Sequence, residues 1–187
     1  MACFFGFGSL VNTGTHRYEA FTPASVIGWK RVWINNDSYE HAFLSVVPDE
    51  SSKIQGLMAK VPNNDWVELD AREVGYARRV LAQDEWLAEA SSLQNHEQKP
   101  DDVQMYVHVK GEHAQPAKPI LWSYVETVLH GYYQWFGEEG VQAFVNSTLA
   151  WTDILDDRAD PIYPRYVPAK GSAIEIVIPT IIRLRES

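Results

Sequence analysis

The segment WVELDAREVGYARRVL, residues 66–81, decides how this sequence is interpreted. At about 100° per residue, its apolar and charged positions separate onto two arcs of a helical wheel, which predicts an amphipathic helix over 66–81. Glu73 then projects into the middle of the apolar arc, and Asp70 lies about 60° away from it. The apolar arc holds Trp66, Leu69, Tyr76, Ala77, Val80 and Leu81, and the polar arc holds Glu68, Arg72, Arg78 and Arg79.

A carboxylate that faces apolar surroundings is costly unless it is paired, protonated or used in chemistry. Glu73 is therefore a candidate general acid or base, with a pKa perturbed by burial. The periodicity favours a structural ion pair with an arginine equally well. Asp70 lies nearer the edge of the arc, and local structural hydrogen bonds are the favoured interpretation for it.

The composition is typical of one globular domain over residues 1–187, with a C-terminal extension at about 148–187. Of the 187 residues, 45% are apolar and 22% charged, and no linker-like segment divides them. The most polar stretch, 88–102, is interpreted as a surface loop or a frayed helix end. The formal charge of −9 argues against a nucleic-acid partner, because phosphate neutralisation needs clustered Lys and Arg.

Other residue counts narrow the kinds of site. The single cysteine, Cys3, leaves no intrachain disulfide and no thiolate metal site. The scattered histidines form no compact ligand spacing, and no cofactor is expected. The acidic residues of 153–160 lack the pattern of a calcium loop, so a solvated or arginine-paired loop is favoured. No apolar stretch is long enough to cross a bilayer and no leader is recognised, so a cytoplasmic protein is expected; the oligomeric state is left open.

The elements predicted from patterning are mostly strands in the first half and helices in the second. This order indicates an α+β fold, either a small β-barrel or a curved mixed sheet with surrounding helices. Strands are expected at 2–7, 26–35, 42–47, 54–61, 103–110 and 174–184. Helices are expected at 120–136, ended by Gly137, and at 138–147; loops are expected at 112–119 and in the proline-rich tail before 174.

The stretch FGFGSL, residues 5–10, is the second candidate site. Its glycines let backbone N–H groups converge on a carboxylate or a developing oxyanion. On spacing alone, such a glycine-containing stretch more often forms a simple tight turn than a binding site. The stretch is neither a phosphate loop nor a dinucleotide fingerprint, and it lacks the GxSxG elbow of a serine hydrolase. Tyr124 lies on the core stripe of the 120–136 helix, where packing is the favoured role.

Several segments together resemble the γ-glutamylcyclotransferase-like superfamily, in a bacterial, largely uncharacterised branch. FGFGSL (5–10) is similar to that family's Tyr-Gly-Ser-Leu loop, and LDAREVGYARR (69–79) to its Leu-Asp-x-x-Glu run with a nearby Tyr. SYVETVLHG (123–131) is similar to its tyrosine-containing helix. The resemblance covers roughly residues 2–136.

The resemblance implies a mixed α/β fold with a cavity at the Gly-Ser loop and no metal or cofactor. It implies that Glu73 is the acid/base and that backbone N–H groups of Phe7, Gly8, Ser9 and Leu10 hold a γ-glutamyl group. Tyr124 matches the family's tyrosine. Phe7 stands where the family has Tyr, so a hydroxyl is missing and substrate choice is affected.

The resulting hypothesis is an enzyme that cyclises a γ-glutamyl amine or peptide to 5-oxoproline and releases the amine, with Glu73 as general acid/base. Its expected partner is a small γ-glutamyl-type molecule. Two alternatives stay open: a non-catalytic small-molecule binding module on the same fold, and another amide- or acyl-processing reaction at the same carboxylate. A purely structural or interaction protein is a third, weaker possibility.

Overall fold

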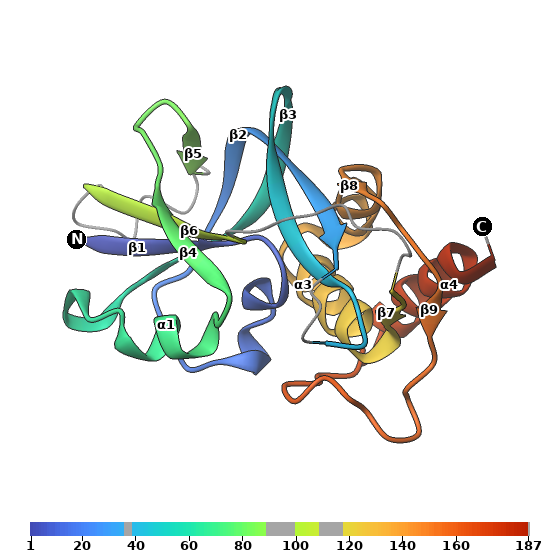
Figure 1. Ribbon diagram of the computed structural model, residues 1–187. Helices are drawn as coiled ribbons and strands as arrows, with labels where there is room; N and C mark the ends of the chain where they lie inside the picture. Colours follow the sequence, from blue (N-terminus) through green and yellow to red (C-terminus); the bar gives the residue numbers. More distant parts are fainter. Residues whose placement is uncertain (36–38, 89–99, 109–117, 187) are drawn as a thin grey trace.

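The computed structural model describes residues 1–35, 39–88, 100–108 and 118–186. Its centre is a curved mixed sheet that does not close into a barrel within those residues, with the helices α3 and α4 gathered at one side (Figure 1). The N-terminus lies at the opposite end of the molecule from α4. The α+β expectation is therefore confirmed, and the sheet takes the curved form of the two that were predicted.

Nine strands occur in the described residues, seven of them in the main sheet in the order β4-β6-β1-β3-β2-β5, with β8 added beside β2. β1 pairs with β6 in parallel, and the long neighbours β2 and β3 pair antiparallel. The strands are β1 (Ala2–Gly6), β2 (Thr22–Ile34), β3 (Phe43–Lys60), β4 (Tyr76–Val80), β5 (Trp86–Ala88), β6 (Asp102–His108), β7 (Ile120–Leu121), β8 (Thr148–Leu149) and β9 (Ile154–Leu155).

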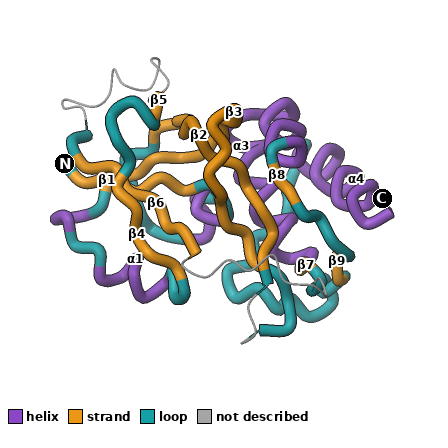
Figure 2. Tube along the Cα trace, turned by 45° about the horizontal axis from the view of Figure 1, so that its top comes forward, coloured by secondary structure: helices purple, strands orange, loops and turns teal. Residues whose placement is uncertain are grey.

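β3 joins two strands that the sequence predicts separately, 42–47 and 54–61. Its central residues between these segments are largely exposed, which interrupts the apolar pattern, and residues 49–52 have no register partner in β2, although the pairing resumes on both sides of them. The register shifts between Ile27 and Trp29, where Gly28 has a φ of +83°, and a bulge at this point bends the strand. The pair is therefore long enough to reach from the β1–β6 side of the molecule to the helices (Figure 2).

The α-helices of the described residues are α1 (Val67–Arg72), α3 (Trp122–Asn146) and α4 (Ala173–Glu186). α3 covers most of both helices predicted at 120–136 and 138–147, although residues 120–121 form strand β7. Its backbone breaks at Gly137 (φ 64°, ψ −160°), as the sequence indicates. α4 packs on α3 (Figure 2). Within the described residues, no helix is long and apolar enough to cross a membrane.

The prediction of one helix over 66–81 is wrong. α1 ends at Arg72, Glu73 caps it, and Gly75 at φ +90° turns the chain into strand β4. β4 pairs antiparallel with β6 along its whole length, from Tyr76 opposite His108 to Val80 opposite Gln104. The sheet edge supplies backbone hydrogen bonds that helical periodicity does not reveal, and tertiary pairing overrides the local pattern.

The strand predicted at 174–184 is also wrong, because this segment forms helix α4 despite its isoleucines and Pro179. The buried positions Ala173, Val177, Thr180 and Ile181 follow helical spacing and face α3. β-branched residues favour strands only weakly, and packing decides here. Most of the polar stretch 88–102 and of the loop 112–119 lies outside the described residues.

Arg31 of β2 joins the sheet to α3 and to the chain after β1. Its side chain is fully buried, and its Nε donates to the Phe7 carbonyl oxygen at 3.0 Å. The Nη groups donate to the Ser147 hydroxyl at 2.6 Å, to the Gln55 carbonyl oxygen and to the Tyr132 hydroxyl. Together with the Tyr132 hydroxyl, which also donates to the Phe7 carbonyl oxygen at 3.0 Å, this side chain fixes where the Gly-Ser loop leaves β1.

Gly131 of α3 sets how closely the helix approaches the same loop. A Cβ at this position would lie 2.6 Å from the Asn12 backbone nitrogen and 2.8 Å from the Asn12 Cα, a contact that only the backbone could relieve. Asn12 is itself buried and donates from Nδ2 to the Thr127 carbonyl oxygen at 2.8 Å. Helix and loop are thus packed backbone to backbone.

We expect Gly131→Ala to lower the free energy of unfolding by about 1–3 kcal/mol through overpacking. The sign of this change in stability is informative, because replacing glycine with alanine at an exposed position inside a helix stabilises the helix by about 1 kcal/mol. Urea denaturation measures the effect, and Gln134→Ala, at an exposed position of the same helix, should change the free energy by less than about 0.5 kcal/mol. A Gly131→Ala protein as stable as the parent would show that the helix and loop can separate freely.

Candidate active site

The Gly-Ser loop begins where β1 ends at Gly6. After Gly8 the chain forms a single 3₁₀ turn, η1 (Ser9–Val11), in which the Val11 N–H donates to the Gly8 carbonyl oxygen at 3.0 Å. A Cβ at Gly8 would lie 2.8 Å from the Tyr124 hydroxyl oxygen and 3.2 Å from Leu44 Cδ2. Glycine is required at this point because the α3 tyrosine and the β3 leucine close on the loop backbone.

Glu73 reaches this loop from the C-terminal end of α1 rather than from the middle of a helix. Its N–H donates to the Leu69 carbonyl oxygen at 2.9 Å, and its own carbonyl oxygen accepts from the Tyr76 N–H at 3.0 Å. The turn at Gly75 follows at once. The backbone on both sides of Glu73 is therefore held by hydrogen bonds, which limits where its carboxylate can point.

All six predicted site residues line one small recess with a volume of about 40 Å³. They come from the Gly-Ser loop (Phe7, Gly8, Ser9 and Leu10), from the end of α1 (Glu73) and from α3 (Tyr124). The remaining walls come from Phe5, Gly6, Leu44, Tyr76 and Tyr106. Three segments that the sequence singled out separately are thus brought together in space.

A larger cleft of about 430 Å³ adjoins the recess. Five residues line both spaces: Ser9, Leu44, Glu73, Tyr76 and Tyr124. The far walls of the cleft come from β3 and the chain before it, including Tyr39 and His41, and from residues 162–165 of the proline-rich tail. The carboxylate of Glu73 therefore stands between a narrow inner space and a wide outer one.

The electrostatics at Glu73 combine burial with a positive neighbour. Its side chain is 18% exposed, and Arg72 Nε lies 3.1 Å from Oε1. Burial raises the pKa of Glu73, while Arg72 and, more weakly, Arg165 act in the opposite direction. The pKa of Glu73 is raised overall, so the effect of burial outweighs that of the ion pair with Arg72.

Arg72 also connects α1 to the loop. Its Nη groups donate to the Thr15 carbonyl oxygen at 3.1 Å, to the Thr15 hydroxyl at 3.2 Å and to the Ser9 hydroxyl at 3.3 Å. The structural interpretation of Glu73 as an arginine-paired carboxylate is therefore realised in part. The same carboxylate nevertheless faces a cavity beside Gly8–Leu10, which a purely structural pair does not need.

Two tyrosines surround the carboxylate with neutral hydroxyls. Tyr76 donates to the Leu44 carbonyl oxygen at 2.8 Å, and burial raises its pKa. Burial also raises the pKa of Tyr124, although a hydrogen bond with the Ser9 backbone partly opposes the shift. The Tyr124 ring packs edge-on against Tyr163, 5.0 Å between centroids. These phenols stay protonated at neutral pH and serve as hydrogen-bonding walls.

The acidic candidates outside the recess are structural. Asp70 accepts from the Tyr106 hydroxyl at 2.7 Å and pairs with Arg78 at 3.0 Å. In the proline-rich tail, Asp156 pairs with Arg158 at 2.6 Å, and the buried Asp157 accepts from the Ser123 hydroxyl at 2.5 Å. In the described part of the chain, no three His, Cys, Asp or Glu side chains gather as metal ligands would.

Helical periodicity misses Arg72, which it places on the solvent side, and gives Tyr76 no role beyond packing. Tyr163 and Arg165 lie in the irregular segment 153–165, for which the sequence leaves three roles open: shaping the cavity, covering it or contacting a partner. The signal that could have found Arg72 is its adjacency to a carboxylate at a helix end, followed by glycine two residues later. No pattern in the tail predicts how it reaches the cleft, because its position depends on tertiary hydrogen bonds to α3, in which the Tyr163 N–H donates to the Ser123 hydroxyl at 3.3 Å and the Val167 N–H to the Thr127 hydroxyl at 2.9 Å.

The arrangement of sheet, loop, short helix and long helix defines the γ-glutamyl cyclotransferase-like fold, and the chain has this fold. It is similar to a solved γ-glutamyl cyclotransferase, with a TM-score of 0.57 and 14% identity over 84% of this chain and 95% of that one. The same values hold for the uncharacterized protein loc79017 from Homo sapiens. YkqA from Bacillus subtilis has a TM-score of 0.57 and 13% identity over 78% of this chain, which spans 53% of its length. No family model and no curated protein matches the sequence.

The raised pKa of Glu73 has a measurable effect on stability. The carboxyl group of Glu73 binds a proton more readily in the folded protein than in the unfolded chain, where its pKa has the ordinary value of 4.5. Protonation of Glu73 therefore stabilises the folded protein at low pH, and this contribution is lost as the pH rises. We expect the difference in free energy of unfolding, parent minus Glu73→Gln, to fall as pH rises from 4.5 through the folded-state pKa. Denaturation at a series of pH values measures it; a difference that rises with pH would show that the Arg72 pair dominates.

The close approach at Gly8 predicts a coupled pair of substitutions. Gly8→Ala places a methyl group 2.8 Å from the Tyr124 hydroxyl and should lower the free energy of unfolding by about 1–3 kcal/mol. In Gly8→Ala/Tyr124→Phe the hydroxyl is gone, so we expect part of the loss to be recovered, with a coupling of about 0.5–3 kcal/mol in a double-mutant cycle. If the changes in free energy of the two single variants simply add up in the double variant, the methyl group at position 8 and the Tyr124 hydroxyl are not in contact.

Proposed function

We propose that the protein is a γ-glutamyl cyclotransferase-like enzyme that converts a γ-glutamyl amine or peptide into 5-oxoproline and the free amine. The observation that carries this proposal is the recess shared by Glu73 and residues 7–10. A carboxylate with an upward-shifted pKa stands beside a glycine-containing backbone turn, and a cleft opens next to it. The fold it shares with a solved γ-glutamyl cyclotransferase supports the same reaction class.

In the proposed reaction, the α-amino nitrogen of the γ-glutamyl group attacks its own γ-carbonyl carbon. Glu73 accepts the proton that this nitrogen loses as the lactam C–N bond forms. The bond from the carbonyl carbon to the leaving nitrogen then breaks, and Glu73 returns the proton to that nitrogen. One carboxylate can do both steps when its pKa is shifted towards neutrality.

The two spaces around Glu73 suggest how such a substrate would lie. The inner recess, at about 40 Å³, holds only a few atoms and is bordered by the backbone of Gly8, Ser9 and Leu10. We assign it to the γ-carbonyl oxygen, whose developing negative charge backbone N–H groups would stabilise. The outer cleft of about 430 Å³ would take the leaving amine. Because the nucleophile belongs to the substrate, positioning supplies much of the acceleration.

The Arg72–Glu73 contact favours one alternative, a binding module in which the carboxylate is held by the arginine and does no chemistry. In that case the cleft would bind γ-glutamyl compounds without turnover. A different amide- or acyl-processing reaction at Glu73 would give products other than a lactam.

A panel of γ-glutamyl peptides and amines, analysed by mass spectrometry for 5-oxoproline, tests the proposal. We expect turnover of at least one compound, and a loss of roughly 10²–10⁴-fold in kcat for Glu73→Gln, the usual contribution of a general acid/base. Glu68→Gln is the matched control, since Glu68 is an exposed carboxylate on the same short helix.

Three outcomes would contradict the proposal. Binding of the panel without 5-oxoproline would indicate the binding module. Other products would indicate a different reaction. Equal activity of Glu73→Gln and the parent would remove Glu73 from the proton transfer.

A further inference from the structure

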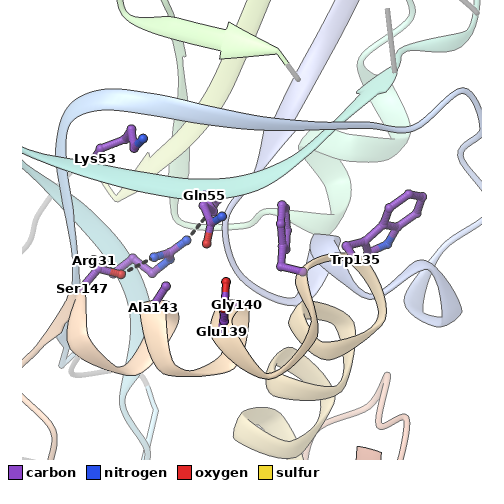
Figure 3. Close-up of a pocket in the computed structure, with 9 residues that line it drawn as sticks. Arg31, Lys53, Gln55, Trp135, Glu139, Gly140, Ala143 and Ser147 are labelled. Atoms are coloured by element: carbon purple, nitrogen blue, oxygen red, sulfur yellow. Dashed lines mark hydrogen bonds between the residues drawn. The ribbon is translucent and has the colours of Figure 1, made fainter. Parts of the chain in front are cut away.

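A second hollow lies on the far side of Arg31 and shares no residue with the recess or the cleft. It is a groove of about 560 Å³ between strands β2 and β3 and the second half of α3, which the break at Gly137 redirects across the sheet (Figure 3). Its walls are Arg31, Lys53, Gln55, Trp135, Phe136, Glu139, Gly140, Ala143 and Ser147.

The Arg31 side chain in this groove is a buried cation with only uncharged partners. Its four hydrogen bonds go to two carbonyl oxygens, Phe7 and Gln55, and two hydroxyls, Tyr132 and Ser147. Figure 3 shows those to Gln55 and Ser147. A guanidinium has five N–H groups, so one Nη N–H has no acceptor among these. Of the ion pairs formed within the described ranges, none includes Arg31.

Aromatic rings compensate this charge only in part. The guanidinium carbon lies 5.1 Å from the centroid of Tyr132 and 4.8 Å from that of Phe144. Such contacts are weaker than the cost of burying a charge without a counter-ion. An anion in the groove would supply the missing charge.

Gln55 adds an independent sign of a ligand. Its side-chain Oε1 is buried and has no hydrogen-bond partner within the described residues. A buried acceptor without a donor is costly, so an occupant with an N–H or O–H group would be favoured there. Lys53 adds a second positive charge to the groove, and Trp135 and Phe136 provide apolar walls for a carbon skeleton.

We propose that this groove binds a small organic acid whose carboxylate faces Arg31 and Ser147 and whose neighbouring hydroxyl or amino group donates to Gln55 Oε1. The remaining Nη N–H of Arg31 is suited to a carboxylate, whereas the Ser147 hydroxyl, which donates to the Phe144 carbonyl oxygen at 3.3 Å, lies beside it. The site is separate from Glu73 and does not depend on the proposed reaction. Glu139, an exposed residue on the helix wall, disfavours occupants of high negative charge.

Lactate and propionate are the probes, because they differ only in the hydroxyl beside the carboxylate. In NMR titrations of the full chain, we expect saturable shifts at amides around Gln55 and Gly140 with both. Lactate should bind roughly two- to tenfold more tightly, the value of one hydrogen bond. Gln55→Leu should remove this preference while propionate still binds. Orthophosphate serves as a third probe and should bind more weakly than lactate.

Ala143→Trp fills the groove from the helix side and should raise both dissociation constants by roughly tenfold or more, since it removes the space for the ligand. Asn146→Trp is the control, because it lies exposed on the same helix outside the groove. The proposal is overturned if no amide shifts saturably, if the shifts centre on Glu73, or if Ala143→Trp binds like the control. Tighter binding of orthophosphate than of lactate overturns the assignment to a carboxylate.

Discussion

The buried guanidinium of Arg31 connects the segments that meet around the candidate active site. One guanidinium holds the carbonyl oxygens of Phe7 and Gln55 and the hydroxyls of Tyr132 and Ser147, so it ties the end of β1, strand β3 and both halves of α3 to β2. Each of these acceptors is buried or nearly so and would lose one hydrogen bond if the side chain were removed, which leaves the Tyr132 hydroxyl, 3.0 Å from the Phe7 carbonyl oxygen and 2.7 Å from that of Gln55, to serve both carbonyl groups. The position of the Gly-Ser loop follows from this anchor.

The candidate active site depends on that anchored loop meeting two side chains from elsewhere. Tyr124 comes from α3, which Gly131 allows to press against Asn12, and Glu73 comes from the end of α1. Arg72 joins the loop and the carboxylate through Ser9, Thr15 and Glu73. The carboxylate is thereby oriented by its own neighbour in the chain and made more basic by burial, a combination suited to moving a proton in both directions.

The residue pattern of the sequence was sufficient to predict a strand or helix where one local signal dominates. Strands β1 and β6, the long helix and its break at Gly137 followed from an apolar run, alternation, periodicity and a single glycine. The residues that the motifs named, 7–10, Glu73 and Tyr124, line one recess. The pattern failed where tertiary contacts compete: β4 pairs with β6 instead of extending α1, and α4 is a helix because it packs on α3. Arg31 could not be found at all, because an arginine in a strand ordinarily faces solvent and only the assembled core shows it buried.

The walls of the outer cleft come from widely separated parts of the chain, and this has a consequence for how the protein is made. Glu73 leaves the ribosome long before residues 162–165, which form the opposite wall. At about 5–20 residues per second, the intervening chain takes roughly 5–20 s to synthesise. During that interval the sheet and the carboxylate exist without the tail that completes the cleft. A nascent chain of this protein therefore gains a bounded binding space only after residues 162–165 have been synthesised.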